Sequence, residues 1–82
     1  MRLPRDVSGR DLSRALDALG YEVVRQTGSH IRLTSRSEPQ HHLTIPDHAA
    51  LRVGTLAGVV ADIAAHHGLS REQVLERLFP GR

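Results

Sequence analysis

A tight turn at Thr27-Gly28-Ser29 constrains the fold of this chain more than any other feature of its sequence. Residues 21–26 before it are rich in side chains that favour strands, and residues 31–35 after it alternate between apolar and polar. The two segments predict an antiparallel hairpin. Neighbouring side chains on a strand point to opposite faces, so apolar residues would enter a core and three polar ones would face outward: His30, Arg32 and Thr34.

A third strand is predicted over residues 41–45, after a loop-forming cluster at residues 35–40. Pro46 would end its pairing because proline lacks the N–H that a strand ladder needs. His42 and Thr44 would point the same way as the polar residues of the hairpin. A three-stranded antiparallel sheet would therefore carry one exposed polar face, which is the candidate site.

Three helices are predicted around these strands. Ser8 would cap the first helix, whose apolar residues recur at helical spacing until Gly20. Thr55 is the expected cap of the second helix, which would end at Gly68. A capping box predicts a short third helix over residues 70–79.

The expected order is therefore helix, three strands and helix, with an additional short C-terminal helix. This order predicts an α+β fold, a two-layer sandwich in which both main helices cover one face of the sheet and the other face is open to a ligand. With 82 residues, the chain is expected to be one domain, residues 1–82, with a single modest core.

The composition excludes several classes of site and of protein. The chain has no cysteine, which rules out a disulfide framework and a thiolate metal site. An aromatic fraction of 2% leaves little on which single-stranded RNA bases could stack. No segment approaches the length of a membrane span, and no apolar run of signal-peptide length begins the chain, so we expect a cytoplasmic protein with no membrane partner.

All 11 basic residues are arginine, and they are unevenly distributed. Seven arginines and four acids give residues 1–36 a net charge of +3, whereas four arginines and five acids give residues 37–82 a net charge of −1. Arginine makes forked contacts to phosphate, although a codon bias in the genome explains the choice equally well. A basic surface is expected on the first helix and the first two strands.

Two blocks of the sequence resemble the HicA (YcfA-like) family of bacterial toxins. The first is the helical stripe of residues 12–19 followed by GYEVVRQTGSH at residues 20–30. The second is IPDH at residues 45–48 followed by GTL at residues 54–56. The resemblance covers residues 7–69, the expected core of the domain, and leaves out the last helix.

This resemblance implies a fold like that of double-stranded-RNA-binding domains and the activity of a metal-independent endoribonuclease that cleaves messenger RNA. It also implies a partner, a HicB-like antitoxin that covers the active face, and it implies no cofactor. The catalytic histidine of the family lies in its Gly-Ser-His motif, which corresponds to His30 here.

RNA cleavage suits this assignment because RNA supplies its own nucleophile, the 2′-hydroxyl group. His30 would act as general base or general acid, a role worth about 10²–10⁴-fold in rate. Arg32 would stabilise the charge of the phosphorane. The backbone N–H groups of Gly28 and Ser29, with the Ser29 hydroxyl, would hold the phosphate, and Arg25 joins this phosphate-binding set.

Each of these residues also has an ordinary structural interpretation. His30 taken alone would be a surface histidine at the start of a strand, and Arg32 a solvated arginine. We expect His48 to be buried and hydrogen-bonded, where it would orient the loop before the second helix. Gly54 and Thr55 fit a helix start, although a helix N-terminus also binds phosphate.

Six histidines raise the question of a metal site. His41-His42 and His66-His67 are adjacent pairs. Neighbours on a strand point to opposite faces, neighbours on a helix diverge, and neither pair has the i, i+4 spacing of two helical ligands. We therefore expect no native zinc site.

Two other functions fit the same fold: a non-catalytic RNA-binding module, and an interaction protein whose basic face docks an acidic partner. Salt dependence separates them, since phosphate binding weakens steeply as salt rises. Pairing through an exposed edge strand, residues 21–26 or 41–45, would give a homo-oligomer, and the antitoxin would give a hetero-oligomer.

Overall fold

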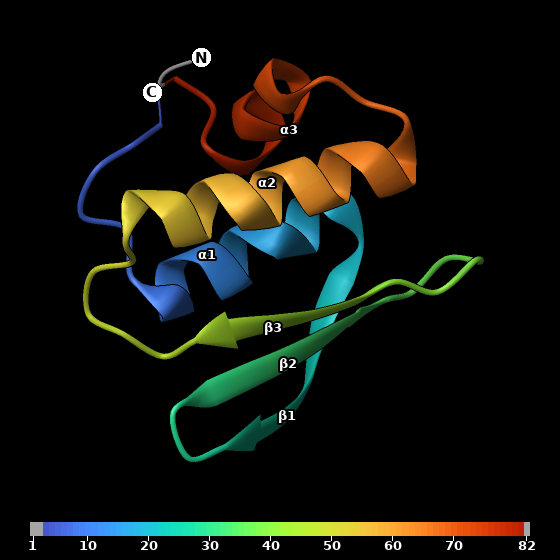
Figure 1. Ribbon diagram of the computed structural model, residues 1–82. Helices are drawn as coiled ribbons and strands as arrows, with labels where there is room; N and C mark the ends of the chain where they lie inside the picture. The colour runs from blue at the N-terminus through green and yellow to red at the C-terminus, as the bar shows by residue number, and fades with distance from the viewer. Residues whose placement is uncertain (1–2, 82) are drawn as a thin grey trace.

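The computed structural model describes residues 3–81, which form one antiparallel sheet and the helices that cover it (Figure 1). In chain order the elements are α1 (Gly9–Ala15), the 3₁₀ turn η1 (Leu16–Leu19), β1 (Tyr21–Thr27), β2 (His30–Ser35), β3 (His42–Pro46), α2 (Val53–His67) and α3 (Arg71–Leu78). The strands lie in the order β1-β2-β3. The α+β architecture predicted from the sequence is confirmed.

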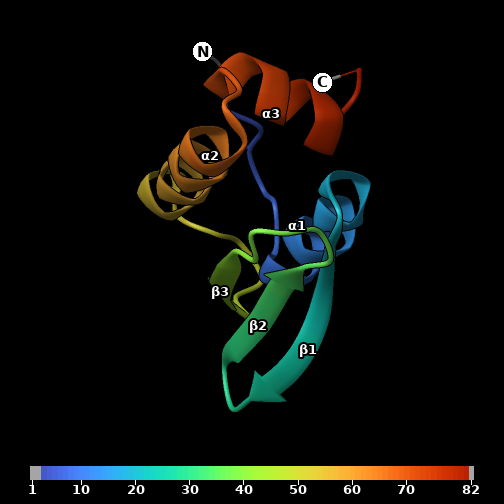
Figure 2. The same ribbon diagram turned by 90° about the vertical axis from the view of Figure 1, so that its right-hand side faces the viewer.

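The helices lie on one side of the sheet (Figure 1, Figure 2). α3 packs against α2 and η1 on the side away from the sheet, as a partial third layer. Val74 and Leu78 of α3 belong to the same buried core as Leu33 and Ile45 of the strands. Within residues 3–81 no helix is long and apolar enough to cross a bilayer, and no element covers the second face of the sheet.

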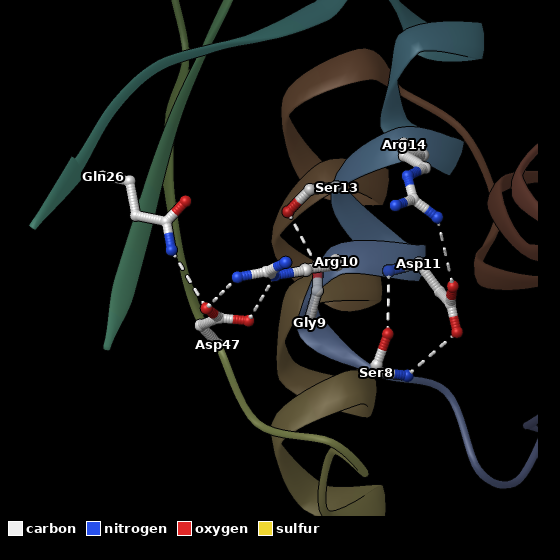
Figure 3. Close-up of polar contacts among 8 residues, drawn as sticks. All are labelled: Ser8, Gly9, Arg10, Asp11, Ser13, Arg14, Gln26 and Asp47. Carbon is white, nitrogen blue, oxygen red and sulfur yellow. Dashed lines mark hydrogen bonds and ion pairs between the residues drawn. The ribbon is translucent and has the colours of Figure 1, made fainter. Parts of the chain in front are cut away.

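Ser8 begins α1 with the capping box that the sequence predicts. Its Oγ accepts a hydrogen bond from Asp11 N–H at 3.0 Å, and its own N–H donates to the Asp11 carboxylate at 3.4 Å (Figure 3). The helix tightens into the η1 turn, and Gly20 then ends it in the left-handed conformation, with φ 86°.

The start of α2 differs from the prediction. The helix begins at Val53, with Arg52 at the cap position and no side-chain cap, so Thr55 already lies in the first turn. A hydrogen bond from Leu51 N–H to Val7 C=O, at 2.7 Å, holds the chain just before this start. The expected Thr55 cap is wrong because a contact with the N-terminal segment, and not a capping side chain, fixes the chain here.

The remaining helix ends follow the sequence closely. Gly68 ends α2 in the left-handed conformation. Ser70 Oγ accepts from Gln73 N–H at 3.0 Å while Ser70 N–H donates to the Gln73 side chain at 2.8 Å, so the second capping box is also confirmed. α3 ends at Leu78, one residue earlier than predicted.

One residue bulges out of β1. Val23 lies opposite Leu33, and Arg25 lies opposite Arg32. The chain thus advances two residues along β1 but only one residue along β2. Val24 is therefore the extra residue. Because side chains alternate along a strand, this single insertion moves Arg25 from the helix-covered face to the open face.

α1 approaches the end of β3 so closely that only glycine fits at its first position. A Cβ on Gly9 would lie 2.0 Å from the Pro46 carbonyl oxygen. Gly9 N–H also donates to His48 C=O at 2.9 Å. These two contacts join the start of α1 to the chain that leaves the sheet.

Candidate active site

His30 begins β2, directly after the turn formed by Gly28 and Ser29. Gly28 adopts a left-handed conformation, with φ 56°, that glycine tolerates better than other residues. The side chain of His30 is exposed, and within residues 3–81 no hydrogen-bond partner holds it. Its register opposite Pro46 of β3 and Thr27 of β1 places it at one end of the open face.

Two arginines share this face with His30. Arg32 follows His30 by two positions on β2, and Arg25 lies directly opposite Arg32 on β1. Both side chains are exposed, and neither forms an ion pair in the part of the chain that the structure describes. Like charges placed directly opposite each other repel, so this pair is an uncompensated positive site and not a stabilising contact.

Acidic side chains neutralise other arginines of the basic N-terminal half. Three ion pairs do so: Arg10–Asp47 at 3.2 Å, Arg36–Asp17 at 3.1 Å and Arg14–Asp11 at 3.9 Å. The basic surface expected on the first helix is therefore largely compensated. On the hairpin, by contrast, Arg25 and Arg32 form no ion pair among the described residues.

The open face predicted from strand alternation is confirmed. Farther from His30, Thr34 Oγ1 and His42 Nδ1 on neighbouring strands lie 2.9 Å apart. Thr44 lies opposite Arg32 on β3. The apolar residues between these positions are buried on the other side, so the polar side chains point away from the helices.

Asp47 holds the turn, the sheet and α1 together (Figure 3). Its carboxylate accepts from Gln26 Nε2 at 2.9 Å and from the Arg10 guanidinium at 3.2 and 3.4 Å. Its backbone N–H donates to Ser29 C=O at 2.7 Å. Asp47 was not among the residues expected at the site, although it belongs to the IPDH block. That block positions the turn that precedes His30.

His48 is not buried. Its side chain is exposed, and its backbone carbonyl is the group that accepts the hydrogen bond from Gly9 N–H. The expectation of a buried, hydrogen-bonded imidazole is therefore wrong. The backbone of the loop, and not the ring, faces α1 at this close contact.

A groove of about 310 Å³ lies between α1 and the helix-facing side of the hairpin. The groove is lined by Arg10, Ser13, Arg14, Val23, Gln26 and Ile31. It lies on the other face of the sheet from His30, and both of its arginines are already paired with acids. We therefore take the open face, and not this groove, as the candidate active site.

Three histidines meet at the end of the sheet opposite His30. The nitrogen atoms that His41, His66 and His67 offer all lie within 4.8 Å of one another. The rings of His41 and His66 are stacked with centroids 4.3 Å apart, and the rings of His66 and His67 meet edge to face at 4.8 Å. The sequence argument considered each adjacent pair by itself and did not anticipate this cluster, which combines one member of the strand pair with both members of the helix pair.

Tyr21, the first residue of β1, contacts this histidine cluster. Its hydroxyl lies 2.5 Å from His41 Nδ1 and 2.9 Å from His67 Nε2. Burial, followed by the charge of Asp62, raises the pKa of Tyr21 to about 12. Burial, followed by neighbouring positive charges, lowers the pKa of His67.

A comparison with protein families identifies the chain. The family model described as "HicA toxin of bacterial toxin-antitoxin" matches residues 9–65. This segment begins with α1, contains the whole sheet with the Gly-Ser-His turn, and ends close to the C-terminal end of α2. No curated protein and no solved structure matches the chain. Because the matched segment spans more than half of the 82 residues, this chain belongs to the HicA family of toxins from bacterial toxin–antitoxin systems.

Proposed function

We propose that this toxin is an endoribonuclease that cleaves messenger RNA in the cytoplasm through His30, without a metal ion at the reacting phosphate. The observation that carries the proposal is the pair of arginines, Arg25 and Arg32, that share the open face with His30 and have no acidic partner among the described residues. A phosphodiester lying on this face would meet two guanidinium groups and one imidazole.

Cleavage of RNA needs one proton removed and one proton supplied. The 2′-oxygen forms a bond to phosphorus while the bond from phosphorus to the 5′-oxygen breaks, which leaves a 2′,3′-cyclic phosphate and a 5′-hydroxyl. His30 transfers one of these protons and water transfers the other. Arg25 and Arg32 stabilise the additional negative charge of the phosphorane.

The turn before His30 supplies the remaining contacts to the phosphate. Gly28 and Ser29 are exposed, and their N–H groups with the Ser29 hydroxyl would contact the phosphate. The Ser29 carbonyl is already held by Asp47 N–H. The turn is therefore anchored on one side while its other side is available to the substrate.

A HicB-like antitoxin would neutralise the toxin by covering the open face. Arg25 and Arg32 give this face uncompensated positive charge, and no element within residues 3–81 lies over it. A partner that presents acidic side chains would complement this charge and would exclude RNA. The resulting complex would be a toxin–antitoxin hetero-oligomer.

A non-catalytic RNA-binding module is the second candidate, and one observation favours it. No side chain in the described part of the chain orients the imidazole of His30. A catalytic base is commonly held in place by a hydrogen bond from a further group. In this second case the two arginines would bind the RNA backbone and no bond would be cut.

The deciding experiment measures cleavage of a mixed-sequence single-stranded RNA by the purified chain in excess chelator. His30→Ala should lower cleavage by about 10²-fold or more while RNA affinity stays close to that of the parent. His48→Ala is the matched control, because His48 is also exposed but lies in the loop after β3. Equal cleavage by His30→Ala would exclude His30 from the chemistry, and binding without cleavage by the parent would favour the RNA-binding module.

A further inference from the structure

We propose that His41, His66 and His67 form a binding site for a transition-metal cation of the zinc class. The cluster joins the residue just before β3 to the last two residues of α2. It lies at the end of the sheet opposite His30, because its neighbour Tyr21 is the first residue of β1. The site is thus separate from the RNA face, and cation binding does not require the chain to be a ribonuclease.

The three imidazoles are close enough to share one cation once their side chains rotate, which includes tilting the His41 and His66 rings out of their stacked arrangement. Each offers a ring nitrogen within 4.8 Å of the other two. Zinc binds imidazole at about 2.0–2.1 Å in a tetrahedral arrangement, which places the ligand nitrogens about 3.4 Å apart. The gap that remains to be closed is at most about 1.4 Å.

Hydrogen bonds already orient two of the rings. His41 Nε2 lies 3.1 Å from Asp62 Oδ1, and His66 Nε2 lies 3.1 Å from Pro39 C=O. Both oxygens are acceptors, so each Nε2 carries the proton and each Nδ1 keeps its lone pair. A carboxylate or carbonyl behind the imidazole is the usual outer contact of a histidine that binds a metal.

The remaining nitrogens converge. His41 Nδ1 and His67 Nε2 both lie within hydrogen-bond distance of one atom, the Tyr21 hydroxyl oxygen, at 2.5 and 2.9 Å. These two nitrogens therefore point at the same small volume, which the Tyr21 hydroxyl occupies in the metal-free chain. The hydroxyl donates its one proton to His41 Nδ1 and accepts from His67 Nε2, so a cation would displace the hydroxyl and His67 would carry its proton on Nδ1 instead. His66 Nδ1 has no hydrogen-bond partner within residues 3–81, so its lone pair is not used by the protein itself.

The donor set selects the class of cation. Imidazole nitrogen suits Zn²⁺, Cu²⁺, Ni²⁺ and Co²⁺, whereas Mg²⁺ and Ca²⁺ prefer oxygen ligands. Asp62 lies one helical turn before His66, where its carboxylate orients His41 from outside the site. Water would complete the four ligands, as it does where a protein supplies three.

Two of the three ligands lie beyond the segment that the HicA family model matches. That segment ends at residue 65, and His66 and His67 follow it directly. The cation site is therefore a feature of the α2 end in this chain. A bound cation would hold the C-terminal end of α2 against the start of β3, which stabilises the helix layer on the sheet.

The test titrates Zn²⁺ into the full chain, prepared without an affinity tag and freed of metal by chelation. We expect one equivalent to bind, and the melting temperature to rise by about 10 °C when free Zn²⁺ reaches about 100 times its Kd. His66→Gln should lower the affinity at least about 10-fold, while its amide can still donate to the Pro39 carbonyl. His42→Gln is the matched control, since His42 adjoins His41 but faces the open side of the sheet, and it should bind as the parent does.

X-ray absorption of the zinc-loaded parent provides a measurement that depends on no variant. Three imidazole ligands on the bound zinc would support the site. The proposal is overturned if the parent binds no stoichiometric Zn²⁺, if the bound zinc has fewer than three imidazole ligands, or if His42→Gln loses binding while a folded His66→Gln retains it.

Discussion

Arg25 on β1 lies directly opposite Arg32 on β2, and an extra residue in β1 puts it there. If the alternation of β1 ran on unbroken, Val24 would take this position and Arg25 would face the helices. The bulge therefore places a second guanidinium group on the open face where an apolar side chain would otherwise stand. Bulges often re-aim a side chain in this way next to active sites.

Arg25→Ala and Arg32→Ala should each weaken RNA binding without weakening the fold. Both side chains are exposed and oppose each other, so removing one should leave the free energy of unfolding unchanged or raise it by up to about 1 kcal/mol. The slope of log affinity against log salt should shrink by about 0.7 for each phosphate of a single strand that the variant no longer neutralises. Fluorescence anisotropy with labelled RNA at several salt concentrations measures this slope.

Arg14→Ala is the control for these two variants, because Arg14 lies on α1 and faces Asp11 at 3.9 Å. It should leave the salt slope unchanged. If Arg25→Ala and Arg32→Ala keep the salt slope of the parent, as Arg14→Ala should, the opposed arginines do not contact RNA.

Gly9→Ala should destabilise the fold, although alanine is normally the better helix former. The added Cβ would meet the Pro46 carbonyl oxygen at 2.0 Å, a contact that only backbone movement relieves. We expect a loss of about 1–3 kcal/mol in the free energy of unfolding, the usual cost of overpacking. Gly58→Ala, inside α2 with nothing within 4 Å of its Cβ, should instead gain about 1 kcal/mol. Urea denaturation measures both, and equal effects would contradict the close approach at Gly9.

Asp47→Ala should loosen the turn of the candidate site. The substitution removes the hydrogen bond to Gln26 and the ion pair with Arg10, whose side chain is 65% exposed. The combined loss should be about 1–2 kcal/mol in the free energy of unfolding. RNA cleavage should also fall, because the turn that precedes His30 is less firmly held. Asp17→Ala removes a comparable ion pair from the other end of the hairpin, with Arg36, and should leave cleavage unchanged. Equal loss of cleavage in both variants would indicate a general loss of stability.

The phenol of Tyr21 should titrate near pH 12 in the folded, metal-free chain, above its ordinary pKa of 10.0. Because the chain has one tyrosine and no tryptophan, near-ultraviolet absorbance follows this ionisation alone. The unfolded chain releases the proton first, so the stability that the neutral phenol contributes is complete below about pH 10 and is lost as the pH rises toward 12. Asp62→Asn should lower the pKa of Tyr21 only in part, since burial is the larger cause. Titration of the folded chain at the ordinary value would contradict a buried hydroxyl.

The scaffold of the site could be predicted because its signals are local. The capping boxes at Ser8 and Ser70 involve a residue three positions away, and Gly20 and Gly68 end helices by their own backbone conformation. The alternation of β2 depends on immediate neighbours and placed His30 on the open face. The assignment of catalysis to His30 stays a prediction.

The features that the sequence does not reveal depend on contacts between distant segments. Alternation carries no signal for a bulge, so the pairing of Arg25 with Arg32 follows only from the register of two strands. His48 is exposed while its backbone carbonyl contacts Gly9 of α1, a distant contact that the sequence does not show. Asp47 could have been suspected only from its place in the IPDH block. The histidine cluster needs the end of α2 to dock beside β3.

The candidate active site and the histidine cluster differ in how much of the chain must fold before each exists. Arg25, His30 and Arg32 lie around one tight turn, so little chain entropy is lost in bringing them together. Tyr21 and His67 are 46 positions apart in sequence and meet only when α2 has docked. Fraying of the last turn of α2 would therefore disperse the cluster while the hairpin kept its two arginines opposed.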